Sequence, residues 1–154
     1  MYDHILDPDI KKTLESYKSK LDASKDKPLD VSSYRVDKPW GYEIWLEVNE
    51  HYAFKLIHMT KGNRCSLQSH EKKVEANYVI AGEAEVLLED ENGVLQSSVY
   101  GVGKGWVVPV GKKHRVIAKT DYTALEVSTP HLDDVIRYQD DSARTSGKIE
   151  SEHK

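Results

Sequence analysis

Four side chains with the chemistry of metal ligands lie in two short stretches of this sequence. Gln68 and His70 are two positions apart, so on a strand both side chains point to the same face. Glu75 follows five residues after His70 and can reach that face from the next strand if the chain bends between them. A fourth ligand must come from elsewhere, and His114 is the best candidate. Two oxygen ligands and two imidazoles suit Zn²⁺, Mn²⁺ or Fe²⁺, so we predict one divalent metal ion here.

The elements that would position these residues follow from the periodicity of the chain. Asp7 has the side chain of a helix N-cap and Pro8 suits the first helical position, so a helix is predicted to start here. The apolar residues that follow at helical spacing give this helix one buried face: Ile10, Leu14, Tyr17 and Leu21. Residues 24–37 are predicted to be a linker or an irregular arm.

From residue 42 to residue 128 the pattern changes to short runs that are typical of β strands. The expected strands are 42–49, 52–60, 64–69, 75–81, 84–89, 94–100, 105–108, 114–118 and 122–128. Many short strands without an intervening helical pattern predict an all-β sandwich or barrel and argue against a parallel βαβ sheet. Residues 131–138 are expected to form a short helix or an edge segment, and the polar residues 139–154 a frayed tail.

The composition restricts the classes of protein to consider. The 154 residues suit one domain, and 22 Lys+Arg against 26 Asp+Glu give a net charge of -4, which disfavours a nucleic-acid partner. Cys65 is the single cysteine, which excludes an internal disulfide and fits a reducing compartment. The first residues show no signal-peptide pattern and no apolar run reaches membrane-spanning length. We therefore expect a cytoplasmic protein without a membrane partner.

The two stretches that carry the candidate ligands resemble the two motifs of the cupin family. The first motif of that family has Gly, a His-x-His pair, Glu and Gly at fixed spacings, and the second has Gly, Pro-x-Gly, His and Asn. The matching residues here are Gly62, His70, Glu75 and Gly82 for the first motif and Gly103, Pro109, Gly111 and His114 for the second. Gln68 stands where the first His of the pair is usual, and Ala118 stands in place of the final Asn.

With Gln68 in place of that His, the sequence resembles the cupin domain of type II mannose-6-phosphate isomerases. Across residues 36–144 the segments that match this domain are Lys38–Gly41, Ser66–Glu75, Val108–Arg115, Leu125–Val127 and Asp133–Arg137. The resemblance implies an all-β cupin fold, a double-stranded β-helix or jelly-roll barrel, with an N-terminal α-helix. The implied organisation is a helix and arm over 1–35, a barrel over 36–138 and a flexible C-terminal tail over 139–154. It also implies a homodimer.

The resemblance further implies a metal-dependent sugar-phosphate isomerase of the mannose-6-phosphate isomerase type, which acts on a small phosphorylated or nucleotide sugar. The ion would polarise sugar oxygens, and a phosphate would need cationic groups. The candidates for substrate binding are Lys55, Arg64 and Arg115, and those for catalysis are Arg64 and Lys73. Arg64 shares the parity of Gln68 on an unbroken strand, whereas Lys55 could point outward and Lys73 could belong to a solvated loop.

The sequence departs from that isomerase pattern close to the candidate metal site. The family has two further His, an Arg and a His-Trp pair around the ligand Glu, and here those positions hold Glu71, Lys72, Lys73, Ala76 and Asn77. Lysine lacks the planar fork of arginine, so Lys73 replaces that Arg only in part. Two alternatives stay open. One is a cupin that binds a sugar or nucleotide sugar without turnover, and the other is a different cupin enzyme such as a sugar epimerase or an oxygenase.

Overall fold

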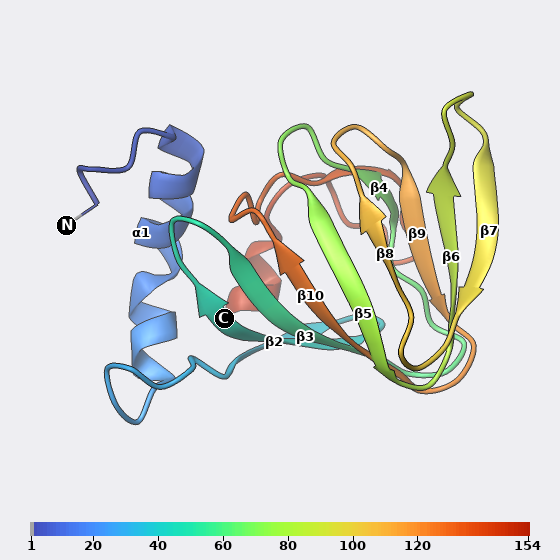
Figure 1. Ribbon diagram of the computed structural model, residues 1–154. Coiled ribbons are helices and arrows are strands. Elements are labelled where there is room, and N and C mark those ends of the chain that lie inside the picture. Colours follow the sequence, from blue (N-terminus) through green and yellow to red (C-terminus); the bar gives the residue numbers. More distant parts are fainter. Residues whose placement is uncertain (1) are drawn as a thin grey trace.

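An N-terminal helix, two antiparallel β sheets and a C-terminal 3₁₀ turn make up the computed structural model, which describes residues 2–154 (Figure 1). Met1, the first residue of the expected region 1–35, lies outside the described residues. The elements in chain order are α1 (Pro8–Ala23), β1 (Tyr34–Lys38), β2 (Gly41–Val48), β3 (Ala53–Met59), β4 (Leu67–Ser69), β5 (Glu75–Ala81), β6 (Ala84–Glu89), β7 (Leu95–Tyr100), β8 (Gly105–Val108), β9 (His114–Ala118), β10 (Tyr122–Ser128), β11 (Ile136–Gln139) and η1 (Glu150–His153). Within the described residues, no helix is both long and apolar enough to cross a membrane.

Helix α1 begins where the sequence predicted it. The Asp7 carboxylate accepts hydrogen bonds from the backbone N–H groups of Asp9 and Ile10, at 2.9 and 3.2 Å, and so caps the first turn. The buried side of the helix joins strands β1 and β2 in an apolar cluster that includes Leu14, Tyr17, Leu21, Val36, Trp45 and Val48. A single amphipathic helix is stabilised mainly by such packing, and the predicted N-terminal helix is confirmed.

The strands form two sheets that face each other (Figure 1). The larger sheet has the order β1-β2-β3-β10-β5-β8, and the smaller has the order β11-β4-β9-β6-β7. Both sheets contribute to an apolar core, which includes Val79, Trp106 and Tyr122 from the larger sheet and Val86 and Ala118 from the smaller one. The predicted all-β class with an N-terminal helix is therefore confirmed.

Two local differences from the expected strands affect the site. Strand β4 covers only Leu67–Ser69, because the residues just before it contribute no more than an isolated bridge between Arg64 and Ile117. Strand β1 begins inside the expected linker, ends one residue beyond it and pairs with β2 along its whole length, so it extends the larger sheet. The first difference changes the direction of Arg64, and the second brings Lys38 to the wall of a cavity.

The polar C-terminal segment, residues 140–154, is packed, in contrast to the frayed tail expected from its composition. Its last turn, η1, ends at His153. This residue is 8% exposed, and its ring lies against that of Tyr17 in α1. Arg144 forms ion pairs with Asp140 and Glu152 at 2.9 and 3.1 Å. In Figure 1 the last turn of the segment, η1 (red), lies between α1 and the strands. Its polar side chains satisfy one another, so a hydropathy pattern does not reveal that they are packed.

Candidate metal centre

A cavity of about 110 Å³ lies between strands of both sheets, the side chain of Tyr17 and the end of the chain. We call the lining residues of the stretch from β1 to β10 the barrel wall, and those between residues 132 and 153 the C-terminal wall. The barrel wall includes three of the four predicted ligands, Gln68, Glu75 and His114. The fourth, His70, is fully buried directly behind this lining.

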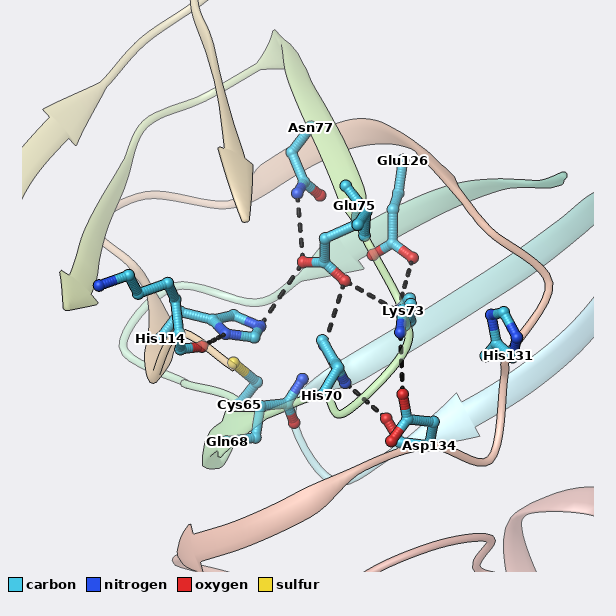
Figure 2. Close-up of polar contacts among 12 residues, drawn as sticks. Cys65, Gln68, His70, Lys73, Glu75, Asn77, His114, Glu126, His131 and Asp134 are labelled. Atoms are coloured by element: carbon cyan, nitrogen blue, oxygen red, sulfur yellow. Dashed lines mark hydrogen bonds and ion pairs between the residues drawn. The ribbon is translucent and has the colours of Figure 1, made fainter. Parts of the chain in front are cut away.

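His70, Glu75 and His114 converge, although they come from three separate parts of the barrel (Figure 2). Glu75 is the first residue of β5 in the larger sheet, His114 is the first of β9 in the smaller sheet, and His70 directly follows β4. The two carboxylate oxygens of Glu75 lie 3.4 Å from His70 Nε2 and 3.6 Å from His114 Nε2. One ligand atom from each residue lies within 4.8 Å of the other two. The packing of the two sheets therefore assembles a three-residue group of the kind that binds a metal ion.

Hydrogen bonds determine which nitrogen of each imidazole faces this group. His70 Nδ1 lies 2.6 Å from the carbonyl oxygen of Asp134, and His114 Nδ1 lies 3.1 Å from that of Lys112. A carbonyl oxygen can only accept, so Nδ1 carries the proton in both rings and Nε2 keeps a free lone pair. Both Nε2 atoms are buried and have no hydrogen-bond partner among the described residues. Two buried lone pairs beside a carboxylate fit a bound cation, and carbonyl partners on Nδ1 are typical of metal-binding histidines.

Gln68 reaches the same place from β4. It lies directly opposite His114 in the β4–β9 pair, so the two side chains project from the same face of the smaller sheet. Its Oε1 accepts a hydrogen bond from Ser66 Oγ at 2.7 Å. Three of the predicted ligands, His70, Glu75 and His114, thus lie close together, and Gln68 lines the same cavity. Cys65 also lines the cavity, but burial raises the pKa of its thiol to about 11, so the thiol stays protonated.

Lys73 supplies the counter-charge for two buried carboxylates (Figure 2). Its Nζ lies 2.8 Å from Glu75 Oε2 and 3.3 Å from Glu126 Oε1, and it is 6% exposed, so the solvated-loop alternative for this lysine is wrong. Burial alone would raise the pKa of Glu75, but the ammonium group of Lys73 holds it well below its usual value. Burial lowers the pKa of His114, which keeps this imidazole neutral, as metal binding requires.

Asp134 fixes the loop that separates His70 from Glu75. Its carboxylate accepts hydrogen bonds from three successive backbone N–H groups, those of residues 71–73, at 3.0, 2.7 and 2.9 Å. Its own carbonyl oxygen accepts from His70 Nδ1, so one residue holds both the loop and a candidate ligand. The sequence marked this residue only as part of the matching segment Asp133–Arg137, because spacing along the chain cannot show a contact between distant segments.

Lys55 points into the cavity, and the alternative that it faces solvent is wrong. It is 5% exposed, and its Nζ lies 3.2 Å from Glu43 Oε2 and 4.7 Å from the centre of the Trp45 ring. Burial alone would raise the pKa of Glu43, but Lys55 and Lys38 hold it below its usual value. The predicted substrate-binding lysine is therefore in the cavity, where its charge already has a carboxylate partner.

Arg64, predicted to bind substrate and to take part in catalysis, lies away from the cavity. The expected parity with Gln68 needs a continuous strand between the two residues, but β4 begins only at Leu67. The Arg64 side chain is 48% exposed, and its Nε donates to Asp141 at 2.5 Å. We therefore remove Arg64 from the candidate site.

Arg115, the third predicted substrate-binding residue, also points away from the cavity. It follows His114 in β9, so its side chain leaves the opposite face of the sheet. There its Nε donates to the carbonyl oxygen of Cys65 at 2.8 Å and its Nη2 to Asp141 at 2.9 Å. These contacts connect β9 to the C-terminal segment, and they give Arg115 a structural role.

The C-terminal wall contributes cavity residues that the sequence patterns did not reveal. It places the charged side chains of Arg137, Arg144 and Glu152 beside those of the barrel wall. Arg137 belongs to one of the segments that match the isomerase domain, but the match alone assigned no function to this residue. The sequence did not predict that Glu152 and Arg144 line the cavity, because charged residues in a polar tail are expected to face water.

The chain is similar to a known protein family and to several curated proteins. A family model described as mannose-6-phosphate isomerase C-terminal matches residues 25–140. A mannose-1-phosphate guanylyltransferase from Salmonella montevideo is 30% identical over 144 residues, which is 88% of this chain and 28% of that protein. The alginate biosynthesis protein AlgA from Pseudomonas putida is 30% identical over 120 residues, 75% of this chain and 24% of that protein. The chain thus spans about a quarter of the length of these curated relatives.

Solved structures of similar architecture are cupins. KdgF from Halomonas sp. superposes with a TM-score of 0.54 at 19% identity, over 60% of this chain and 82% of that chain. A single-residue variant of oxalate decarboxylase from Bacillus subtilis superposes with a TM-score of 0.62 at 23% identity, over 71% of this chain and 31% of that chain. At these identities the likeness shows the fold, and the cupin architecture predicted from the two motifs is confirmed.

Proposed function

The chain belongs to the mannose-6-phosphate isomerase C-terminal family, and from this premise we propose that it interconverts an aldose phosphate and a ketose phosphate, with mannose 6-phosphate or a close relative as substrate. The proposal rests on the buried, unpartnered Nε2 atoms of His70 and His114, which face the Glu75 carboxylate. A divalent ion, Zn²⁺, Mn²⁺ or Fe²⁺, held there together with Gln68 would supply Lewis acidity to the sugar oxygens. That chemistry suits an isomerase because negative charge develops on those oxygens during the reaction.

Within this proposal Lys73 is a positioning residue. Burial alone would lower its pKa, but Glu126 and Glu75 raise it, so the ammonium group stays charged and is a poor proton carrier. It holds one oxygen of Glu75, while Asn77 Nδ2 donates to the other oxygen at 3.3 Å. These two donors keep the Glu75 carboxylate charged and directed toward the imidazoles.

Substrate entry requires the cavity to widen. Its volume of about 110 Å³ is below the roughly 300–1,000 Å³ that is usual for small-molecule pockets. The barrel wall is held by strand pairing, whereas Glu152 in the C-terminal wall is held by ion pairs with Lys38 and Arg144, at 2.6 and 3.1 Å. We therefore propose that the C-terminal segment shifts when a sugar phosphate binds.

A coupled assay for the conversion of mannose 6-phosphate to fructose 6-phosphate tests the proposed reaction. Protein loaded separately with each of the three ions is compared with His70→Ala and with the control His51→Ala, whose imidazole is 79% exposed. We expect turnover that the first substitution abolishes and the second preserves. A protein that binds its ion tightly, yet interconverts no aldose and ketose phosphate, contradicts the proposal.

Binding of a sugar or nucleotide sugar without turnover is the second candidate function. It is favoured by Lys73, which stands at the family's arginine position and whose charge is taken up by Glu75 and Glu126. The name of a relative, mannose-1-phosphate guanylyltransferase, makes guanosine-diphosphate sugars a class to test. Calorimetric binding measured beside the isomerase assay separates the two functions, because only the binding module gives affinity without product.

The proposed partner is accordingly a small phosphorylated or nucleotide sugar. A net charge of -4 gives no support to a nucleic-acid partner. The single cysteine, Cys65, suits a reducing compartment, and on that ground we propose a cytoplasmic location. Fractionation of cells that express the protein checks this location, with detection of the protein in the soluble fraction and in the membrane pellet.

The outer face of the larger sheet supports the homodimer expected from the sequence. The apolar side chains that point outward from β3, β10, β5 and β8 are Phe54, Leu56, Leu125, Val127, Ala76, Tyr78, Ile80 and Val107. We call them the uncharged outer face, since none of the outward residues described on these strands is Asp, Glu, Lys or Arg. Tyr78, Val107 and Val127 are 52%, 55% and 47% exposed. Four strands give a flat patch of roughly 450 Å², a size at which apolar patches are often functional.

We propose that a second copy of the chain covers this face. A two-fold axis brings like residues together, and an uncharged patch avoids the like-charge contacts that such pairing would otherwise create. Light scattering at micromolar concentration should give a dimer for the wild type and a monomer for Val127→Glu. The control Val99→Glu, at a position 50% exposed on the smaller sheet, should remain dimeric. A monomeric wild type contradicts this pairing.

A further inference from the structure

Within residues 2–154, six cationic side chains line the cavity, and one of them lacks a carboxylate partner. The five paired cations are Lys38 with Glu152 at 2.6 Å, Lys55 with Glu43 at 3.2 Å, Lys73 with Glu75 at 2.8 Å, Arg144 with Asp140 at 2.9 Å and Lys148 with Glu150 at 3.3 Å. Among the described residues, Arg137 contacts only backbone carbonyl oxygens. The other five cations are therefore paired with carboxylates of the chain, and the guanidinium of Arg137 remains available to a ligand.

The free part of the Arg137 guanidinium is one defined edge. Its Nη1 donates to the carbonyl oxygens of Thr145 and of Gly147, the latter at 3.0 Å. Its Nε is buried and has no hydrogen-bond partner in the part of the chain that the structure describes. The unused donors are therefore Nε–H and the two N–H bonds of Nη2, which lie side by side. This edge matches two oxygens of a phosphate or carboxylate in the bidentate geometry that arginine favours.

The two carboxylates near Arg137, those of Glu152 and Asp140, are already paired with Lys38 and Arg144. Burial lowers the pKa of its guanidinium, and the nearby charge of Arg144 lowers it further. A buried donor without a partner costs free energy, and a charged donor costs more than a neutral one. An anion on the free edge would remove both penalties, so this edge has the properties of an anion-binding site.

The position of Arg137 relates this edge to the candidate metal centre. Arg137 lies directly opposite Gln68 in the β11–β4 pair, and Gln68 lies opposite His114 in the β4–β9 pair. Residues opposite each other on antiparallel strands project from the same face, with Cβ atoms about 5 Å apart. The three side chains therefore form one row across the smaller sheet, from the anion edge at Arg137 to the imidazole at His114.

We propose that the Nε–Nη2 edge of Arg137 binds the phosphate group of a sugar phosphate whose other end reaches the candidate metal centre. The identity of the sugar rests on the proposed function, but binding of a phosphate monoester by Arg137 does not require turnover. The contacts of Nη1 fasten the guanidinium to residues 145 and 147, so the same side chain couples the phosphate to the C-terminal wall.

Isothermal titration calorimetry of the metal-loaded protein tests this site with mannose 6-phosphate and unphosphorylated mannose as probes. We expect Arg137→Gln to raise the Kd for mannose 6-phosphate by about 10- to 100-fold, the loss of one or two charge-assisted hydrogen bonds. The Kd for mannose should stay within about twofold. Arg137→Lys keeps the charge but not the fork, so an intermediate loss of about tenfold is expected. The control Arg35→Gln, an exposed arginine paired with Asp37, should change neither value.

Three results would overturn the site. They are an unchanged Kd for mannose 6-phosphate in both Arg137 variants, an equal loss for phosphorylated and unphosphorylated sugar, and a wild type that binds mannose 6-phosphate no better than mannose. Circular dichroism and thermal unfolding show whether Arg137→Gln is folded, and if it is not, Arg137→Lys decides alone. Failure of the proposed function looks different. A wild type with Arg137-dependent binding but no isomerisation keeps the anion site and removes the isomerase.

Discussion

The two walls of the cavity carry similar charged groups but are held in different ways. In the barrel wall, β4 pairs with strands on both sides and β5 does the same, so backbone register determines where Gln68 and Glu75 point. In the C-terminal wall, the strand β11 lies at a sheet edge and the residues beyond it depend on side-chain ion pairs such as those of Glu152. We infer that the barrel wall keeps its geometry when a ligand residue is replaced, whereas the C-terminal wall loosens when a single charge is removed.

The largest effect is expected in the barrel wall, from loss of a predicted metal ligand. His114→Ala should lower turnover by at least about a thousandfold, because several kcal/mol of Lewis-acid stabilisation are lost with the ion. The metal-free variant should nevertheless fold, since its strand retains its pairing with β4 and β6. Enzyme assays and circular dichroism measure the two parts of this prediction. A folded His114→Ala protein with wild-type turnover would remove the imidazole from the site.

The next effect compares two neighbouring lysines of the same loop. Lys73→Met should lower the free energy of unfolding of the metal-free protein by about 3–5 kcal/mol, because Glu75 and Glu126 are left buried without a cation. Lys72→Met, at a side chain 52% exposed, should leave it nearly unchanged. Urea denaturation of both variants gives the values. Equal effects would mean that the inward direction of Lys73 is wrong.

The corresponding pair in the C-terminal wall is Glu152 and Glu150. Glu152→Gln should lower the free energy of unfolding by about 2–3 kcal/mol, because Lys38 loses its carboxylate partner in a buried setting. Glu150→Gln, at a side chain 78% exposed, should be close to neutral. The same denaturation experiment applies. If Glu152→Gln is also neutral, the C-terminal segment does not pack as described, and the frayed tail expected from its composition would be the better description.

The last comparison is a pH dependence that comes from His153. Burial lowers its pKa to about 4, and the charges of Lys38 and Lys148 add to the shift. An unfolded histidine titrates near 6.5, so between pH 6.5 and pH 4 the unfolded state binds more protons and stability falls as the pH falls. His153→Gln should flatten this part of the stability curve, and the control His51→Gln, at an exposed position, should leave it unchanged. Thermal unfolding at several pH values measures the slope, and equal slopes in the wild type and His153→Gln would contradict the burial.

The barrel and the convergence of His70, Glu75 and His114 could be predicted because their information is local in the sequence. Alternation of apolar residues marks most strands between residues 42 and 128, and the offset between Gln68 and His70 matches the two-residue period of a strand. Glu75 and His114 lie at the ends of strands whose runs were recognisable, so the parity of each side chain follows from the strand itself. Such features can be recognised without knowledge of which strands are neighbours in the sheets.

The remaining part of the cavity depends on where elements begin and on contacts between distant segments. A shift of three residues in the start of β4, from 64 to 67, reverses the conclusion for Arg64. The burial of Lys73 depends on Glu126 in β10, and that of Glu152 depends on Lys38 in β1. A polar tail that forms ion pairs with a strand far away in the sequence has the same composition as a disordered one, so the pattern favoured the disordered interpretation.

The most direct test of the central claim is a calorimetric titration of the metal-free protein with Zn²⁺, supported by elemental analysis. Gln68, His70, Glu75 and His114 should together bind one ion per chain. We predict a stoichiometry of one for the wild type and a loss of this binding in both His70→Ala and His114→Ala. A wild type that binds no ion, or variants that bind it as tightly as the wild type, would contradict a metal centre at these residues.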